Sequence, residues 1–370
     1  MLIDHKPAAQ YDFSHLAQEP GFESLPPPPA NPLTESLDYI KVDNYFLKRP
    51  DGKTLSPLVR QETQPALIAG RLNEDCSSVV PLGPNCLLLC EFDGASSRNG
   101  IRGLDKHGLT GAFYVSHLAA LSFSQSEVLA RLVNQPDIIA SDVLREMNPW
   151  LKSKLEKIDG VDYKDVLSIP GMASVICLID ANAGQASIAN VADSLALIKS
   201  PNTKPELLTV NQNKCFDDAT LNLLDKLAEE HQLTPRQVRE NPELNKIIKA
   251  QLAESFIQKI NTSGGCGILN GMPELDSNNL IAEKIIPVPE DGSLLYLLSD
   301  GSILPYSHRD MCIDQTLDLL VAQNSAGLDS TQTSLLWNGA QILLGDPELI
   351  EFPRLRDDDK TMIVVKFSNV

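Results

Sequence analysis

The apolar residues of this chain form short runs that stop abruptly at acidic residues. The run LLLCEF, residues 87–92, ends at Asp93 and Gly94, and the run LLYLLS, residues 294–299, ends at Asp300, again before a glycine. A buried carboxylate without a partner is costly. We therefore expect Asp93 and Asp300 to lie where a positive charge offsets their own.

Strand patterns surround these acidic positions. Residues 77–92 predict two strands about a GPN turn, and residues 173–198 predict two long strands about an NAG turn. Residues 361–367, TMIVVKF, predict a last strand. Hairpins outnumber any strand–helix–strand rhythm, which favours an antiparallel α+β fold over a doubly wound parallel sheet.

Helical periodicity fills most of the segments between these strands. It covers residues 108–133, 138–158, 216–232, 234–260, 310–325 and 330–344. We expect an interruption near Pro149, because proline lacks the N–H that a helix interior needs. Thr234 and Pro235 are the residue types that begin a helix, so we expect the segment 234–260 to start there.

The composition of the chain limits the kinds of molecule that it can bind. The chain has 370 residues, 42% of them hydrophobic, and can bury a large core as one or two domains. Its net charge is −18. Such a charge disfavours binding to nucleic acid and to an anionic membrane surface, while it is compatible with divalent cations.

The cysteines and the N-terminus indicate the compartment. Seven cysteines, an odd number without a CxxC pair, argue against a disulfide framework or a zinc ribbon. The first residues, MLIDHKPAAQYDF, lack the basic and apolar blocks of a signal peptide. We expect a cytoplasmic protein, and secretion by a signal-free route stays open.

Two regions stand apart from the strand pattern. Residues 1–55 form a proline-rich extension with PPPPANP at 26–32, which favours polyproline II and acts most simply as a spacer or strap. Within the remaining domain, residues 56–370, we expect an enlarged helical insertion at about 200–290 with a solvated charged face. Binding of a protein partner by the extension or by the insertion is the alternative.

Acidic residues stand at the edges of apolar strands in four places: Glu74 and Asp75, Asp93 with Gly94, Asp300 with Gly301, and Asp357, Asp358 and Asp359 before Thr361. Mg²⁺ and Mn²⁺ prefer oxygen ligands, and a pair of such ions needs carboxylates from several segments. Each Asp-Gly alone is typical of a plain turn. Four acidic strand edges in one chain indicate a metal site.

The order of these motifs, RLNED, FDG, ANVADS, LLSDG and DDDKT, resembles the metal-dependent Ser/Thr protein phosphatases of the PP2C family. The match runs from about residue 64 to residue 370. The resemblance implies two antiparallel β-sheets packed as a sandwich flanked by helices, with two Mg²⁺ or Mn²⁺ ions at one end. It implies attack by a metal-bridging water on a phosphoserine or phosphothreonine of a protein substrate. A third, weaker metal site could use Asp75.

The resemblance also implies the ligands. Asp93 would bridge the two metals, and the carbonyl of Gly94 would bind one of them. Asp300 and Asp358 would complete the set, Asp358 being the aspartate three residues before Thr361.

Other family roles carry over less directly. Glu74 and Asp75 would hold metal-bound waters. Arg71 and Arg98 are candidates for gripping the phosphate through the planar guanidinium. His107 is a candidate general acid, although a surface histidine is the simpler interpretation.

Two departures from the family pattern leave alternatives open. Ala95 follows Asp93-Gly94 where the family commonly has glycine, and Ala192 replaces the glycine of the turn that contains Asp193 and Ser194. The turn at Ala192 must therefore keep a negative φ or carry strain. The alternatives to a protein phosphatase are a regulatory module of the same fold, a small-molecule phosphatase, and an α+β protein with coincidental Asp-Gly turns.

Overall fold

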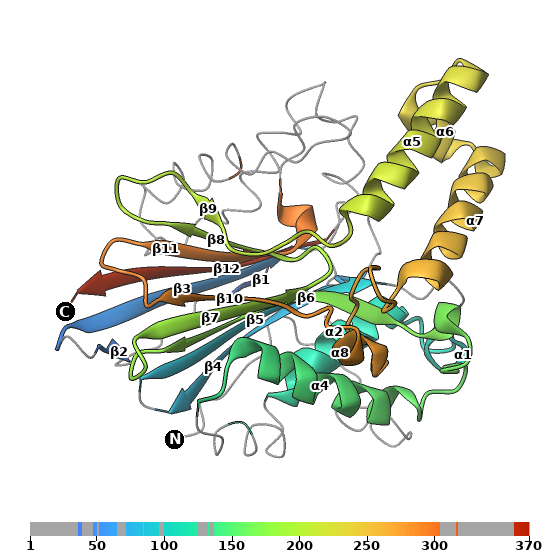
Figure 1. Cartoon of the computed structure of the whole chain (residues 1–370). Coiled ribbons are helices and arrows are strands. Elements are labelled where there is room, and N and C mark those ends of the chain that lie inside the picture. The colour runs from blue at the N-terminus through green and yellow to red at the C-terminus, as the bar shows by residue number, and fades with distance from the viewer. Residues whose placement is uncertain are drawn as a thin grey trace.

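Two antiparallel β-sheets pack face to face at the centre of the molecule, as the computed structural model shows (Figure 1). This architecture, with helices outside the sheets, confirms the predicted fold class. The structure describes residues 36–38, 47–49, 52–64, 72–83, 85–95, 100–123, 132, 137–303, 316 and 359–369. The proline-rich PPPPANP, the helix expected at 330–344 and, apart from residue 316, the helix expected at 310–325 lie outside these residues.

One sheet has five strands in the order β10-β7-β6-β5-β4. Their bounds are β4 Asp75–Gly83, β5 Cys86–Ala95, β6 Gly171–Asp180, β7 Gln185–Val191 and β10 Ala282–Pro287. The two predicted hairpins, β4–β5 and β6–β7, are both present. At the NAG turn, Asp180 accepts hydrogen bonds from the backbone N–H groups of Asn182 and Ala183.

The second sheet has the order β1-β3-β12-β11-β8-β9, and β2 pairs with β3. Its strands are β1 Ser36–Asp38, β2 Leu47–Lys48, β3 Thr54–Gln64, β8 Leu195–Lys199, β9 Glu206–Leu207, β11 Leu294–Leu298 and β12 Lys360–Asn369. The prediction of two strands within 173–198 is wrong in its second half. The chain leaves the first sheet at Ala192 and enters the second sheet as β8.

The turn at Ala192 takes the strained alternative. Ala192 has φ of +61°, a left-handed conformation that costs about 1–2 kcal/mol for a residue with a Cβ. Gln212 holds this conformation, because its backbone N–H donates to the Ala192 carbonyl at 2.9 Å. The side chain of Gln212 also accepts from Gly267 N–H and donates to the Leu280 carbonyl, which ties the turn to two later segments.

Alternation along β5 separates two hydrophobic cores. Leu87 and Leu89 point between the sheets, while Leu88 and Cys90 point toward the helices. Successive side chains of a strand point to opposite faces. The inward series therefore continues through residues 91 and 93, which carries two acidic side chains toward the space between the sheets.

Helices α2, Gly111–Ser122, and α4, Ala140–Leu155, cover the outer face of the five-stranded sheet (Figure 1). The interruption expected near Pro149 is wrong, because α4 continues through this proline. Buried Leu144 and Leu151 on either side of it hold the helix against the sheet. Shorter helices are α1 Arg102–Asp105, η1 Val166–Ser168, α8 Glu274–Ser277 and η2 Asp300–Ser302.

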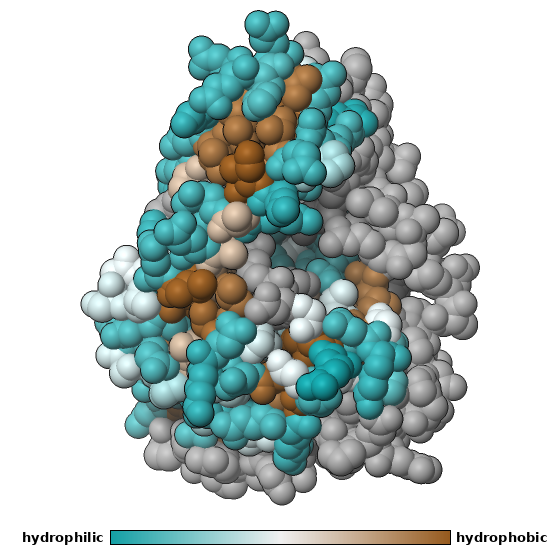
Figure 2. All heavy atoms as spheres, turned by 90° about the vertical axis from the view of Figure 1, so that its right-hand side faces the viewer, coloured by the Kyte–Doolittle hydropathy of each residue, from teal (hydrophilic) through white to brown (hydrophobic). Residues whose placement is uncertain are grey.

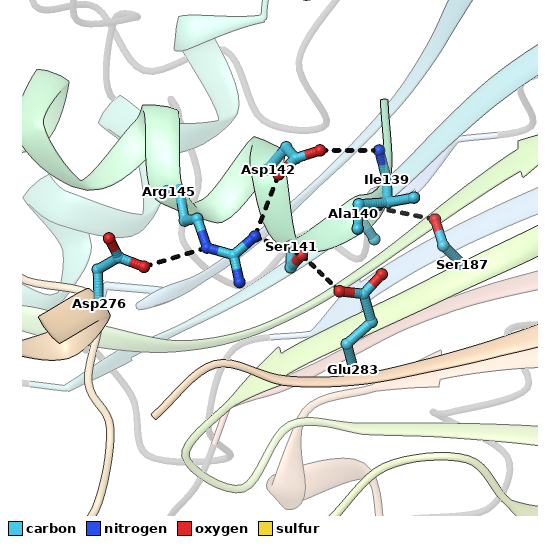
Figure 3. Close-up of polar contacts among 8 residues, drawn as sticks. All are labelled: Ile139, Ala140, Ser141, Asp142, Arg145, Ser187, Asp276 and Glu283. Atoms are coloured by element: carbon cyan, nitrogen blue, oxygen red, sulfur yellow. Dashed lines mark hydrogen bonds and ion pairs between the residues drawn. The ribbon is translucent and has the colours of Figure 1, made fainter. Parts of the chain in front are cut away.

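A polar network fixes the beginning of α4 (Figure 3). The buried Ser141 hydroxyl donates to Glu283 Oε2 of β10 at 2.5 Å. Arg145 donates to the Ser141 hydroxyl at 2.9 Å and to Asp276 Oδ1 of α8 at 3.0 Å. The network attaches α4 to the edge strand β10 and to α8. It therefore stabilises the helical layer on the outer face of the five-stranded sheet.

Helices α5 Lys214–His231, α6 Pro235–Glu240 and α7 Pro242–Lys259 form an arm that projects from the sandwich (Figure 1). Thr234 and Gln237 form the capping box that begins α6. The prediction of one helix over 234–260 is wrong at Asn241, since the residue before a proline disfavours helical backbone. Asn241 instead caps α7, and its side chain accepts from the Glu243 and Leu244 N–H groups.

The arm has a small core of its own, formed by Leu224, Leu227, Ala228, Val238, Leu244 and Ile248. Figure 2 shows apolar side chains on the arm within a hydrophilic surround. In the described part of the chain, no helix combines the length and the apolar composition that a bilayer-spanning segment requires.

Candidate metal centre

Asp75 and Asp93 are direct neighbours across two strands. They pair in the antiparallel register of β4 and β5, and Ser77 pairs with Glu91 one step further along. Side chains of such a pair have Cβ atoms about 4.5–5.5 Å apart, and like charges in this position destabilise a sheet. A cation between the two carboxylates would remove the repulsion.

The second sheet delivers two more carboxylates to the same end of the sandwich. Asp300 follows β11 and Asp359 precedes β12, and both side chains are buried. Because β11 and β12 are antiparallel, the end of one lies beside the start of the other. Ser299 fixes this junction, since its hydroxyl accepts from Thr361 N–H at 2.9 Å.

A hydrogen bond joins the acidic ends of the two sheets. The backbone N–H of Glu74, just before β4, donates to Asp359 Oδ2 at 2.6 Å. Asn73 turns the chain at the same place, because its Oδ1 accepts from Asp75 N–H at 3.0 Å. Residues far apart in the sequence therefore meet at this end of the sandwich.

Gly94 allows three elements to meet closely beside Asp93. Its N–H donates to the Glu74 carbonyl at 3.2 Å. A Cβ at this position would lie 2.5 Å from the Glu74 carbonyl oxygen and 2.6 Å from the Ala112 carbonyl oxygen. Both are backbone atoms, one in the segment before β4 and the other in α2, so a side chain here would push these elements apart.

We expect Gly94→Ala to lower the free energy of unfolding by about 1–3 kcal/mol, the usual cost of overpacking. Chemical denaturation monitored by fluorescence measures this loss. Gly100→Ala is the matched control, because its Cβ would approach the end of the Asp105 side chain, which can move. Equal stability of the two variants would contradict the close approach at Gly94.

Glu91 is a buried carboxyl group that the motifs do not indicate. Its side chain is fully buried between the sheets, and neither Oε atom has a hydrogen-bond partner of ordinary geometry. Burial raises the pKa of Glu91 well above its usual value, the Ser194 hydroxyl lowers it in part, and the charges of Asp300 and Asp193 raise it again. The alternation of β5, with Leu87 and Leu89 inward, is the sequence signal that places Glu91 here.

His117 lies in α2 next to the residue that contacts the Glu74 carbonyl. Its Nδ1 lies 2.9 Å from the Phe113 carbonyl, so Nδ1 carries the proton in this contact, and the ring stacks on Phe113 at 4.0 Å. Burial lowers the pKa of His117 to about 4, and the contact with the Phe113 carbonyl opposes this shift in part. His117 is therefore neutral at pH 7.

Of the predicted site residues, the structure brings together Glu74, Asp75, Asp93, Gly94 and Asp300. Arg71, Arg98 and Asp358 lie outside the described residues, and their roles stay predictions. His107 is half-buried in the turn after α1.

The donor set fits hard divalent cations in kind, because carboxylate oxygens are the ligands that Mg²⁺ and Mn²⁺ prefer. Asp75 stands opposite Asp93, and the charge of Asp300 raises the pKa of the buried Glu91, so several acidic groups lie close together at this end. Among the residues that the structure describes, no three acidic, histidine or cysteine side chains converge on one metal position. A complete set of ligands would require the segment before Asp359, which includes Asp358.

No family model and no curated protein matches the chain. The serine/threonine phosphatase PstP/Ppp of Mycobacterium tuberculosis is similar at 17% identity with a TM-score of 0.43, covering 85% of this chain and 99% of the phosphatase. Stp1 of Staphylococcus aureus, a serine/threonine phosphatase, is similar at 16% identity with a TM-score of 0.45, covering 83% of this chain and 94% of Stp1.

RsbX, in a structure with magnesium, is similar at 11% identity with a TM-score of 0.43, covering 90% of this chain and 100% of RsbX. Solved structures similar to the chain thus include bacterial serine/threonine phosphatases, the kind of protein that the motifs resemble. At these identities and TM-scores the likeness carries no conclusion about activity. What the chain can do rests on its own acidic residues.

Proposed function

We propose that the protein is a metal-dependent phosphatase that hydrolyses phosphoserine and phosphothreonine monoesters. One observation carries the proposal: carboxylates from both sheets meet at one end of the sandwich, where Asp359 accepts from the Glu74 N–H and Asp75 stands opposite Asp93. Such crowding of like charges is unfavourable without a cation. A purely structural role would not require it.

In this proposal, two Mg²⁺ or Mn²⁺ ions would be held by Asp93, Gly94, Asp300 and Asp358. When bound, these ions supply a nucleophile at neutral pH and stabilise charge that develops on the phosphate. The buried walls of the sandwich keep the aspartates in place.

Recognition of the substrate would fall to residues around this site. A guanidinium of Arg71 or Arg98 would grip the phosphate oxygens through two parallel hydrogen bonds. The domain would span residues 56–370, and its insertion at 200–290 would contain the arm formed by α5, α6 and α7. The arm could then contact a phosphorylated protein, while the net charge of −18 disfavours nucleic acid.

A regulatory module of the same fold is the second candidate. The observation that favours it is the altered sequence after Asp93-Gly94, where Ala95 stands in place of the glycine that is common in the family. A module of this kind would bind a phosphorylated partner without turning it over.

Turnover assays test the proposal. Hydrolysis of p-nitrophenyl phosphate and of a phosphothreonine peptide is measured with Mn²⁺, with Mg²⁺ and with EDTA. We expect metal-dependent hydrolysis of both compounds and none in EDTA. A folded protein that binds Mn²⁺ but hydrolyses neither would support the regulatory module, and hydrolysis in EDTA would contradict the metal-dependent mechanism.

A further inference from the structure

We infer that Ser116 and Asp359 are positioning residues that hold the backbone of Glu74, and with it the acidic segment Glu74–Asp75, in the geometry that metal binding requires. The inference rests on the proposed function. The resemblance assigns neither residue as a metal ligand, although Asp359 is one of the acidic residues at the strand edges. Ser116 lies in the middle of α2 and Asp359 lies at the start of β12, 243 residues apart in the sequence.

Ser116 holds the Glu74 carbonyl from the side of the helices. The serine is fully buried, and its hydroxyl lies 2.5 Å from the Glu74 carbonyl oxygen. The alternative acceptors within the helix, the Ala112 and Phe113 carbonyls, are farther away at 3.1 Å and 3.2 Å. A hydroxyl has one proton to donate. The shorter distance assigns that proton to Glu74, so the bond links α2 to the segment before β4.

Gly94 N–H is the second donor to the same carbonyl, at 3.2 Å. A carbonyl oxygen has two lone pairs, and these two donors fill both. The Glu74 carbonyl is therefore fully engaged by protein groups from α2 and β5. Its orientation is fixed by both neighbours at once.

Asp359 binds the backbone N–H of Glu74. Its Oδ2 accepts from the Glu74 N–H at 2.6 Å, and the aspartate is buried. A charged acceptor makes a shorter and stronger hydrogen bond than a neutral one. The N–H and the carbonyl of Glu74 are thus both bound, and the bonds come from both sheets and from α2.

Fixing the backbone of Glu74 also fixes Asp75, which follows it. Asp75 stands opposite Asp93 in the β4–β5 register. Outer groups that orient metal-binding residues typically change metal affinity by 10- to 100-fold when they are mutated. We therefore expect Ser116 and Asp359 to affect metal affinity without contacting the metal.

The test compares matched variants of the full-length chain. Ser116→Ala removes the hydroxyl, and Ser122→Ala is its control, because the Ser122 hydroxyl bonds only within α2, to the Ala119 carbonyl at 2.6 Å. Asp359→Ala removes the acceptor for Glu74 N–H, whereas Asp359→Asn keeps an oxygen acceptor and removes the charge. Mn²⁺ affinity is measured by calorimetry, and amide exchange of residues 73–76 is measured by mass spectrometry without metal.

We expect Ser116→Ala and Asp359→Ala to weaken Mn²⁺ binding by at least about tenfold and to speed amide exchange at residues 73–76. Ser122→Ala should stay within about threefold of the wild-type affinity, whereas Asp359→Asn, which keeps the oxygen acceptor, should lose less affinity than Asp359→Ala. Loss of affinity in Asp359→Asn equal to that in Asp359→Ala would overturn the inference for Asp359, because its charge would then act directly on the metal.

Unchanged amide exchange in Ser116→Ala and Asp359→Ala would overturn the inference for both residues. The proposed function fails separately, if the wild-type protein binds Mn²⁺ but shows no turnover. If the wild-type protein binds no Mn²⁺, the proposed function and the role of these residues toward a metal are both overturned.

Discussion

Asp93→Asn and Asp300→Asn are each expected to lower metal-dependent turnover by about 10²- to 10³-fold, the range seen when one electrostatic stabiliser of a transition state is removed. The physical reason is the position of the two carboxylates. Asp93 ends β5 opposite Asp75, and Asp300 follows β11 from the other sheet. Each substitution removes a charge that the cations require. Initial rates with Mn²⁺ and a phosphothreonine peptide measure the loss.

Asp93→Asn should stabilise the metal-free protein, although it lowers turnover. Asp75 and Asp93 repel each other across β4 and β5, and relieving such a pair is worth about 0.2–1 kcal/mol. Asp93→Asn should therefore raise the midpoint of thermal unfolding in EDTA while it abolishes stabilisation by Mn²⁺. Calorimetric scans with and without Mn²⁺ measure both effects.

Asp180→Asn is the matched control for both measurements. Asp180 lies at the opposite end of the sandwich, since it pairs with Cys86 while Asp93 pairs with Ala173. Asparagine can still accept the hydrogen bonds of the turn through its side-chain oxygen. Turnover and Mn²⁺ stabilisation should match the wild type. An Asp93→Asn variant that keeps wild-type turnover would exclude Asp93 from the site.

Acidic pH is expected to lower the stability of the folded protein through His117. Burial lowers the pKa of His117 from 6.5 to about 4. In the unfolded chain the imidazole binds a proton below pH 6.5, whereas in the folded protein it does so only near pH 4. The unfolded state therefore binds more protons between these values, and stability falls as pH falls. At 1.36 kcal/mol per pKa unit, the full loss at pH 4 is about 3 kcal/mol.

His117→Gln should remove this contribution. Denaturation curves at several pH values between 7 and 4 give the difference between wild type and variant, which cancels the titration of carboxylates elsewhere. We expect the wild type to lose about 3 kcal/mol more than the variant over this range. Ser122→Ala, a change in the same helix without a titrating group, should keep the wild-type slope. Parallel curves for His117→Gln and wild type would show that His117 does not titrate as its burial implies.

Much of the fold can be predicted from the sequence because its signals are local. The β4–β5 and β6–β7 hairpins follow from short apolar runs about turn residues. The errors arise where tertiary contacts override local preference. Pro149 remains inside α4 because buried neighbours hold the helix against the sheet. Ala192 takes a left-handed conformation because Gln212, 20 residues later, binds its carbonyl.

Antiparallel strands that end in Asp93 and Asp300, with further acidic residues at the edges of other strands, can be predicted from the sequence alone. The sequence does not show that Ser116 reaches the acidic end of the sandwich, or that Asp359 binds the backbone of Glu74. A serine within a helix carries no mark of function until another segment contacts it. These contacts exist only in the folded chain, because the Glu74 backbone is held by bonds from α2, β5 and the start of β12. Contacts between segments so far apart depend on the packing of both sheets and leave no local pattern in the sequence.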